Sequence, residues 1–232
     1  MARKFAVKTV LSYSYSGDDS KAHDNGMMTK TNHLKGLLAV MNATNPGWFY
    51  PAIVSATGFS LFDIVDKEAR DIACEIWSKS KILTTLNNPG HQVGAFVCIR
   101  QGLLACRALG ATYMISYGDD IIPTYVDDAD RRLNRICEQG ADWSSTKFAD
   151  NCQINTQVFI CKVDSLLPYI NLGCFSRKIS QSLINGTEYC LEQYLFEAMT
   201  EAGLKIDING GGQDYGHVHD PIRLLKELEK FQ

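Results

Sequence analysis

The sequence lacks several features that would assign it at once to a class of protein. Its 232 residues contain no run of about 18 consecutive apolar residues, so we expect no transmembrane helix. Lys and Arg number 23 against 26 Asp and Glu, which gives a formal net charge of −3. Proteins that bind nucleic acid through phosphate contacts normally carry a basic excess, so we expect no nucleic-acid partner.

No CxxC pair occurs among the eight cysteines, so the sequence offers no typical structural zinc site. A chain of this length can bury a core without disulfide bonds. Six cysteines fall within apolar helical or strand patterns, where a thiol packs as a small hydrophobe. We therefore expect buried free thiols at Cys74, Cys98, Cys106, Cys137, Cys161 and Cys190.

The N-terminus begins like a secretory signal, with Arg3 and Lys4 before an apolar stretch. Lys8 interrupts that stretch, and no small-residue cleavage site follows it. We interpret the segment as a first β-strand and expect a soluble, cytoplasmic protein. Hydrophobic residues make up 45% of the chain, and no Pro/Ser-rich linker or internal repeat divides it, which indicates one domain over residues 1–232.

Strand-like and helical segments alternate along the first part of the chain. Strands are predicted at 5–15, 50–55, 81–86 and 111–117, and helices at 27–43, 62–80, 92–109 and 127–138. This alternation predicts an α/β fold, in which helices flank a mixed, mainly parallel central sheet of Rossmann-like type. Ligands bind such sheets at the carboxyl ends of the strands.

The pattern changes in the second part of the chain. Further strands are predicted near 148 and at 154–162 and 205–208, with a helix at 187–202 and a short charged helix at 221–231. Residues 1–122 are therefore interpreted as a nucleotide-sugar-binding half of the domain, and residues 123–232 as an acceptor and catalytic half.

Two adjacent carboxylates follow one of the predicted strands. The strand at 111–117 leads into Gly118, Asp119 and Asp120. Hard divalent cations prefer carboxylate oxygens, and a cation held at this edge of the sheet could bridge a diphosphate. The ordinary alternative is a solvated turn that leaves a strand.

A second segment joins a predicted strand to a helix. It contains Asn88, Gly90 and His91, and Arg100 follows within the helix. Gly90 permits a close approach to the helix start, where unsatisfied N–H groups favour anions. No Gly-Lys-Ser/Thr follows, so the segment is not a P-loop, and an ordinary strand–helix turn is the alternative.

Two glutamates lie near the start of the helix predicted at 187–202. Glu188 falls in its first turn, and Glu192 lies one turn later on the same face. A carboxylate in this place could act as general base towards an acceptor hydroxyl. The alternative is that it only complements the positive end of the helix dipole.

The C-terminal part carries a glycine-rich loop followed by two histidines. Residues 210–216 include three consecutive glycines, which we interpret as a lid that moves. His217 and His219 follow, and one imidazole of such a pair could bind a metal ion. A surface HxH pair is usually inert, so its importance depends on the Asp119–Asp120 pair in the same chain.

Taken in order, these features resemble the nucleotide-sugar-dependent glycosyltransferases of the GT-A fold. The resemblance is strongest over residues 81–122 and continues more weakly through the strand at 153–161, the helix of Glu188 and the histidine-bearing tail. It implies a metal-dependent glycosyltransferase. Such an enzyme moves a sugar from a nucleoside-diphosphate sugar, such as a UDP- or GDP-sugar, to a hydroxyl of a glycan or glycoconjugate.

The resemblance also implies a metal site. The Asp-x-Asp motif of that family holds Mn²⁺ or Mg²⁺ on the donor diphosphate. In this chain Gly118 stands at its first position and Asp120 at its last. The family pattern implies that His219 or His217 completes the site.

The same resemblance implies roles for the remaining candidates. The general base of an inverting transfer would be Glu188, with Glu192 as the alternative. The residues implied in binding the nucleotide sugar are Ser12, Tyr13, Ser14, Asn88, Gly90, His91, Arg100 and Asp119.

Two other functions stay open. A sugar-nucleotide pyrophosphorylase-like enzyme shares this architecture, but it usually carries a Gly-rich loop with Arg and Lys directly after the first strand. This chain has only Gly17 there. A degenerate, non-catalytic carbohydrate-binding domain would fit the missing aspartate at Gly118. A homo-oligomer is also compatible with the sequence.

Overall fold

The computed structural model describes residues 6–12, 30–45, 50–57, 67–85, 91–118, 121–123, 127–146, 153–208, 215–217 and 226–227. The strands are β1 (Ala6–Ser12), β2 (Ala52–Thr57), β3 (Lys81–Thr85), β4 (Tyr113–Gly118), β5 (Ile121–Pro123), β6 (Trp143–Ser145), β7 (Val158–Lys162), β8 (Ile206–Asp207) and β9 (Tyr215–His217). Seven of them form one sheet in the order β3-β2-β1-β4-β7-β6-β8, and β5 pairs with β9 in a second sheet. The helices are α1 (Lys30–Thr44), α2 (Lys67–Lys79), α3 (His91–Ala108), α4 (Asp128–Gln139), α5 (Val163–Leu166), the 3₁₀ helix η4 (Leu167–Tyr169), α6 (Leu172–Ile184) and α7 (Leu191–Glu201).

The seven-stranded sheet is mainly parallel. Strand β1 pairs in parallel with both β2 and β4, β2 with β3, and β6 with β8. Strand β7 runs antiparallel to both of its neighbours, β4 and β6. The prediction of a mixed, mainly parallel α/β sheet is therefore confirmed.

The strand order reverses between β1 and β4. From β1 the chain proceeds through β2 to β3 on one side, and then crosses back to β4 on the other side of β1. The register pairs Leu11 of β1 with Gly118 of β4, so the two strands reach their carboxyl ends together. The carboxyl ends of strands at such a reversal are the usual ligand-binding place in α/β sheets.

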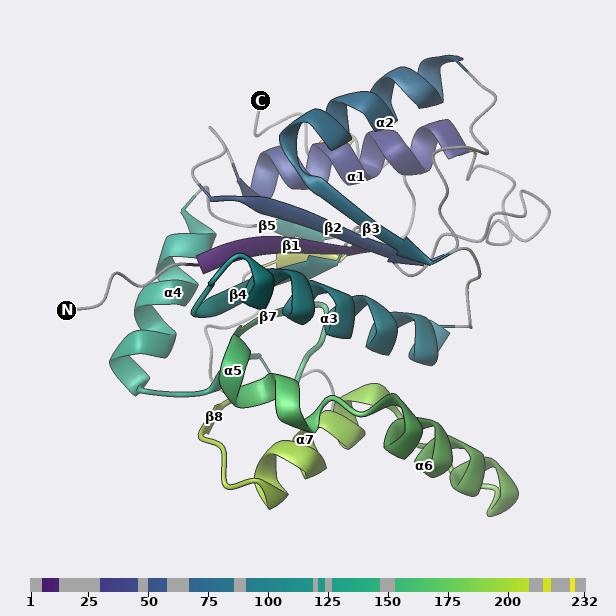
Figure 1. Cartoon of the computed structure of the whole chain (residues 1–232), viewed down its shortest axis with the longest axis vertical. Coiled ribbons are helices and arrows are strands. Elements are labelled where there is room, and N and C mark those ends of the chain that lie inside the picture. The colour runs from purple at the N-terminus through teal and green to yellow at the C-terminus, as the bar shows by residue number, and fades with distance from the viewer. Residues whose placement is uncertain are drawn as a thin grey trace.

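Helices cover both faces of the sheet. Figure 1 shows α1 and α2 on one side of it, and α3, α6 and α7 on the other. Alternate residues of β4 separate the two faces: Met114 joins the core beneath α3, whereas Ile115 and Tyr117 join the core beneath α4. Gly102 lets α3 approach the sheet closely, because a Cβ there would lie 3.0 Å from Cγ2 of Thr9.

Aromatic rings connect α3 to the helices of the second half. The ring of Phe96 on α3 stacks on that of Phe175 on α6, with centroids 4.9 Å apart. Tyr194 on α7 contacts both rings, at 5.9 Å from Phe96 and 5.1 Å from Phe175. Because Phe96 and Phe175 are fully buried, this cluster fixes α6 and α7 against α3.

In the second half, the start of one predicted helix was wrong and another helix was missed. The helix predicted at 187–202 begins only at Leu191, because Cys190 is extended (φ −112°, ψ 167°) and its thiol accepts the N–H of Gln193 as a cap. Helix α6 was not predicted, and its last residues, Leu183 and Ile184, are 73% and 84% exposed. Apolar residues on a solvent-facing helix end hide the periodicity on which such a prediction depends.

Of the cysteine predictions, some are confirmed and others are wrong, and two further predicted elements lie wholly or mostly outside the described residues. Cys98, Cys106 and Cys161 are buried and free as expected, whereas Cys74 is exposed on α2, and Cys137 and Cys190 are partly exposed. The strand predicted near 148 lies outside the described residues, as does most of the helix predicted at 221–231, of which 226–227 are helical. None of the helices within the described ranges is long and apolar enough to cross a membrane.

Candidate functional site

The candidate site lies at the carboxyl edge of the sheet, where β1 and β4 end side by side. Strand β4 ends at Gly118, directly before Asp119 and Asp120 in the sequence. Strand β1 ends at Ser12, one residue beyond the Leu11–Gly118 pair. Ser12 is therefore at the predicted place, while Asp119 and Asp120, like residues 13–14, lie outside the described residues.

Helix α3 begins at the same edge. It follows β3, which runs parallel to β1 and β4, so its first residue, His91, lies on the carboxyl side of the sheet. Its 18 residues make it long enough to present a full set of unsatisfied N–H groups there, which favour an anion. Asn88 and Gly90 lie outside the described residues.

Arg100 is not brought to this edge. It lies nine residues after His91, which is about 14 Å along the helix axis, and its side chain is exposed. Its predicted contact with a nucleotide therefore has no support from the fold.

The start of α7 is fastened to the start of α3. The backbone N–H of Leu191, the first residue of α7, donates to Oε1 of Gln92, the second residue of α3, at 2.8 Å. Two helix N-termini therefore meet at the carboxyl edge, and their partial positive charges add. Gln92 was not among the predicted site residues, because the contact joins residues that are far apart in the chain.

A short series of contacts connects Glu192 to the end of β4. The N–H of Gly118 donates to the carbonyl oxygen of Gln157 at 2.7 Å. The residue before Gln157, Thr156, donates its hydroxyl hydrogen to Oε1 of Glu192. Glu192 is thus connected through Thr156 and Gln157 to Gly118, the last residue of β4.

Glu188, in contrast, precedes α7 in a segment without regular secondary structure and is exposed. The prediction that Glu188 lies in the first turn of this helix is wrong, because the helix begins only at Leu191. Among the described residues, no hydrogen bond or ion pair holds the Glu188 side chain towards the edge of the sheet.

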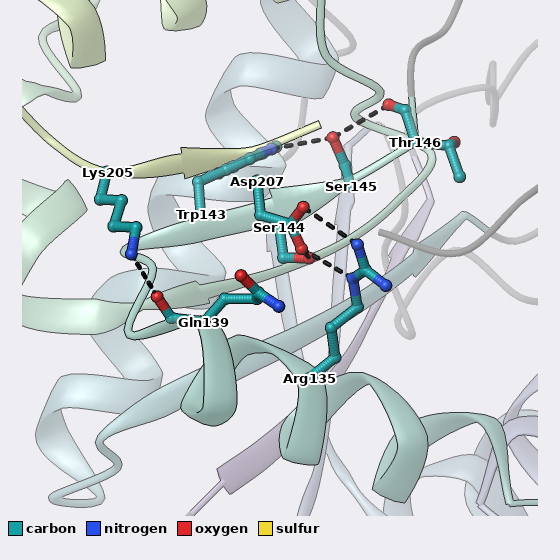
Figure 2. Close-up of polar contacts among 8 residues, drawn as sticks. All are labelled: Arg135, Gln139, Trp143, Ser144, Ser145, Thr146, Lys205 and Asp207. Carbon is teal, nitrogen blue, oxygen red and sulfur yellow. Dashed lines mark hydrogen bonds and ion pairs between the residues drawn. The ribbon is translucent and has the colours of Figure 1, made fainter. Parts of the chain in front are cut away.

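A buried hydroxyl network fixes the backbone that leads to Thr156. Ser145, at the carboxyl end of β6, accepts Nε1–H of Trp143 at 2.9 Å and donates to the carbonyl oxygen of Thr146 (Figure 2). The N–H of Asn155 donates to the same Ser145 oxygen at 3.1 Å, and the Asn155 amide donates to Oγ1 of Thr146. These bonds hold the two ends of the β6–β7 connection together, at the residue directly before Thr156.

A neighbouring ion pair holds the outer strands of the sheet against α4. Arg135 donates from Nε and Nη2 to the two carboxylate oxygens of Asp207, at 2.8 and 3.2 Å (Figure 2). Ser144 donates to the same carboxylate at 2.9 Å. These contacts join β8 to β6 and to α4, so we assign them a structural role.

The small sheet sets the backbone of His217 beside the segment that follows β4. Strand β9 pairs antiparallel with β5, and His217 is the register partner of Ile121, the residue directly after Asp120. Within the described parts of the chain, no three His, Cys, Asp or Glu side chains are grouped to hold a metal ion. Asp120 and His219 lie outside those parts, so the metal site stays a prediction.

The other face of β4 carries a buried charged cluster. Tyr117 donates to Oδ2 of Asp128 at 2.6 Å, and Nε of Arg132 donates to the same oxygen at 2.7 Å. Burial first, and the Asp128 carboxylate second, hold the pKa of Tyr117 well above its ordinary value. Since Tyr117 directly precedes Gly118, this cluster fixes the end of β4 from the side of the sheet that α4 covers.

Lys8 of β1 belongs to the same cluster. Its side chain is 2% exposed, and its ammonium nitrogen lies 5.3 Å from the ring centroid of Tyr117 and 5.8 Å from that of Tyr50. Burial lowers the pKa of Lys8 from 10.5 to about 7, against the opposing influence of Asp128 and Asp130. The sequence analysis used Lys8 only to exclude a secretory signal.

Comparison with solved structures gives the fold but not the activity. No family model and no curated protein matches the sequence. A proposed nucleotide-diphospho-sugar transferase from Desulfovibrio desulfuricans G20 superposes with a TM-score of 0.53 at 12% identity, over 88% of this chain and 78% of that one. The bifunctional IspDF of Campylobacter jejuni superposes with a TM-score of 0.50 at 12% identity, over 97% of this chain. The match spans about half (54%) of the length of IspDF.

A 4-diphosphocytidyl-2C-methyl-D-erythritol synthase is also similar, with a TM-score of 0.49 at 10% identity over the whole of both chains. The structure from Desulfovibrio desulfuricans G20 establishes a nucleotide-diphospho-sugar transferase-like fold, and at 12% identity it establishes no more than the fold. The fold predicted from the sequence is therefore confirmed, and the reaction has to be argued from the site.

Proposed function

We propose that the protein is a transferase that binds a nucleoside-diphosphate sugar at the carboxyl edge between β1 and β4 and transfers the sugar to a hydroxyl acceptor. One observation carries the proposal: the Gly118–Gln157 and Thr156–Glu192 hydrogen bonds connect a carboxylate to the end of β4, which Asp119 and Asp120 follow in the sequence. A transferase of this kind needs a charged group for the diphosphate and a base for the acceptor in one place.

Glu192 is the better candidate for the base. Its Oε1 accepts from Thr156, which orients the carboxylate, while Oε2 forms no hydrogen bond with any described residue. In the reaction this carboxylate takes the proton of the acceptor hydroxyl. The acceptor oxygen bonds to the anomeric carbon, and the bond from that carbon to the diphosphate oxygen breaks. Glu188 stays the second candidate.

The resident metal ion of this site would be Mn²⁺ or Mg²⁺. Asp120 would bind it together with His219 or His217, and a carboxylate donor suits both of these ions. The β5–β9 pairing, which sets His217 beside the residue after Asp120, supports this donor set. When bound, the ion supplies positive charge that stabilises the departing diphosphate.

Product analysis tests the proposal. The protein is incubated with Mn²⁺ and a panel of nucleotide sugars, with and without simple glycoside acceptors. Release of a nucleoside diphosphate, with growth of the acceptor by one sugar, is the expected result. Release of pyrophosphate from a nucleoside triphosphate and a sugar phosphate would instead identify the pyrophosphorylase-like alternative. Absence of both products would support a non-catalytic domain.

A further inference from the structure

A pocket of about 440 Å³ lies among η4, α6 and α7. Its volume falls within the usual range for small-molecule sites. Three of its residues, Tyr194, Ala198 and Glu201, recur on one face of α7. Glu192 lies nine residues before Glu201, which is half a turn around the helix, so the pocket is on the face of α7 that points away from Glu192. It is therefore separate from the candidate transferase site.

The apolar wall of the pocket is rigid. The hydroxyl of Tyr194 donates to the carbonyl oxygens of Tyr169 and Asn171, at 3.3 Å each, and its ring packs on the buried Phe175. Tyr169, which is 39% exposed, and Pro168 continue this wall towards solvent. Aromatic and apolar surface is thus presented in a fixed position before any ligand binds.

The polar lining mixes hydrogen-bond donors and acceptors. The ammonium group of Lys178 and the amide of Asn171 can donate, and the carboxylate of Glu201 can accept. Lys178 is paired with Glu197, a contact that raises the pKa of Lys178 above its usual range. The charges of that pair cancel, and Glu201 then leaves one negative charge at the pocket.

We propose that this pocket binds one ring of a neutral saccharide. A sugar ring has a C–H face that packs on apolar and aromatic surface, and an edge of hydroxyls that both donate and accept. The C–H face of the ring would pack on Tyr169, Tyr194 and Pro168. Its hydroxyls would form hydrogen bonds with Asn171, Lys178 and Glu201. The negative charge of Glu201 disfavours phosphates and nucleotides.

Saturation-transfer NMR on the whole chain tests this binding. The probes are the methyl glycosides of glucose, galactose, mannose and N-acetylglucosamine, with choline and methyl phosphate as charged probes. We expect transfer to at least one glycoside, unchanged by UDP and Mg²⁺, and none to methyl phosphate. Tyr169→Ala should weaken that binding about three- to tenfold, since one ring contact is lost.

The control is Trp77→Ala, which removes an aromatic residue that is 49% exposed on α2, on the opposite side of the sheet. Binding that falls in Tyr169→Ala and stays constant in Trp77→Ala supports the proposal. Absence of transfer to every glycoside overturns it, as does a signal that Tyr169→Ala leaves unchanged. Binding of choline alone, lost in Glu201→Gln, would show a cation site instead. None of these results bears on nucleotide binding, so the proposed function is tested separately.

Discussion

The hydroxyl of Thr156 donates a hydrogen bond to the carboxylate of Glu192, although the two residues are separated by 36 positions in the chain. The contact joins the segment directly before β7 to the first turn of α7. Thr156 is itself fixed beside β4 through its neighbour Gln157, which accepts the N–H of Gly118. The relationship therefore ties a positioned carboxylate to the edge of the sheet where the strand order reverses.

Replacement of the carboxylate tests its role as a base. Glu192→Gln should lower the rate of sugar transfer about 10²–10⁴-fold, because the acceptor hydroxyl loses its proton acceptor. Affinity for the donor nucleotide should stay nearly constant, since the amide preserves the shape of the side chain. Steady-state transfer rates and a titration of the nucleoside diphosphate measure the two effects separately.

Glu188→Gln is the matched control, since Glu188 is an exposed glutamate four residues earlier. We expect it to retain turnover. Full activity in Glu192→Gln together with loss in Glu188→Gln would move the base to the segment before α7. Full activity in both variants would remove a glutamate base from the account.

Asp119 and Asp120 carry the predicted metal dependence. Asp120→Ala should abolish the gain in nucleotide affinity that Mn²⁺ confers, whereas Asp119→Ala should have a milder effect. The reason is that Asp120 matches the last carboxylate of the family motif. Isothermal titration of UDP and GDP, with Mn²⁺ and with EDTA, measures this gain. An Asp120→Ala protein whose affinity still rises with Mn²⁺ would refute the assignment.

The elements of the first half could be predicted from the sequence because their signals are local. Helix α3 was predicted at 92–109 and observed at His91–Ala108, since a long apolar pattern ends at Gly110, which adopts a positive φ of 72°. The contacts that assemble the site are not local. Nothing in the sequence pairs Gln92 with Leu191, and the hydrogen-bonded polar side chains of the β6–β7 connection have no periodic signal.

The burial of Lys8 predicts an unusual dependence of stability on pH. Its pKa is about 7 in the folded protein and 10.5 when exposed, so between these values the unfolded chain binds more protons. The free energy of unfolding should therefore rise with pH in this window, by up to about 1.4 kcal/mol per unit for one group. Below pH 7 both states are protonated, and this contribution is constant.

Lys8→Met is the variant that isolates this effect. It should be more stable than the parent protein at pH 7, and its stability should rise less between pH 7 and 8, below the ordinary pKa values of thiols and tyrosines. Urea unfolding at several pH values provides both comparisons. Equal slopes in the two proteins would show that Lys8 keeps an ordinary pKa in the fold.

The attachment of α6 and α7 should depend on one aromatic side chain. Phe175→Ala removes a fully buried ring that contacts Phe96 and Tyr194, and should lower the free energy of unfolding by about 3–5 kcal/mol. Leu183→Ala, at a side chain that is 73% exposed on the same helix, should change it by no more than about 0.5 kcal/mol. Similar losses in the two variants would contradict the packing described for α6.

The most direct test of the central claim is thermal unfolding of the whole protein with a panel of UDP-, GDP- and other nucleotide sugars, each with Mn²⁺ and with EDTA. A ligand at about 100 times its dissociation constant stabilises the folded state by about 2.7 kcal/mol, which corresponds to a rise in Tm of roughly 5–10 °C for a chain of this length. The account predicts such a rise for at least one nucleotide sugar with Mn²⁺, and a much smaller one with EDTA. If no nucleotide sugar raises the Tm in the presence of Mn²⁺, the carboxyl edge between β1 and β4 is not a nucleotide-sugar site and the proposed function is wrong.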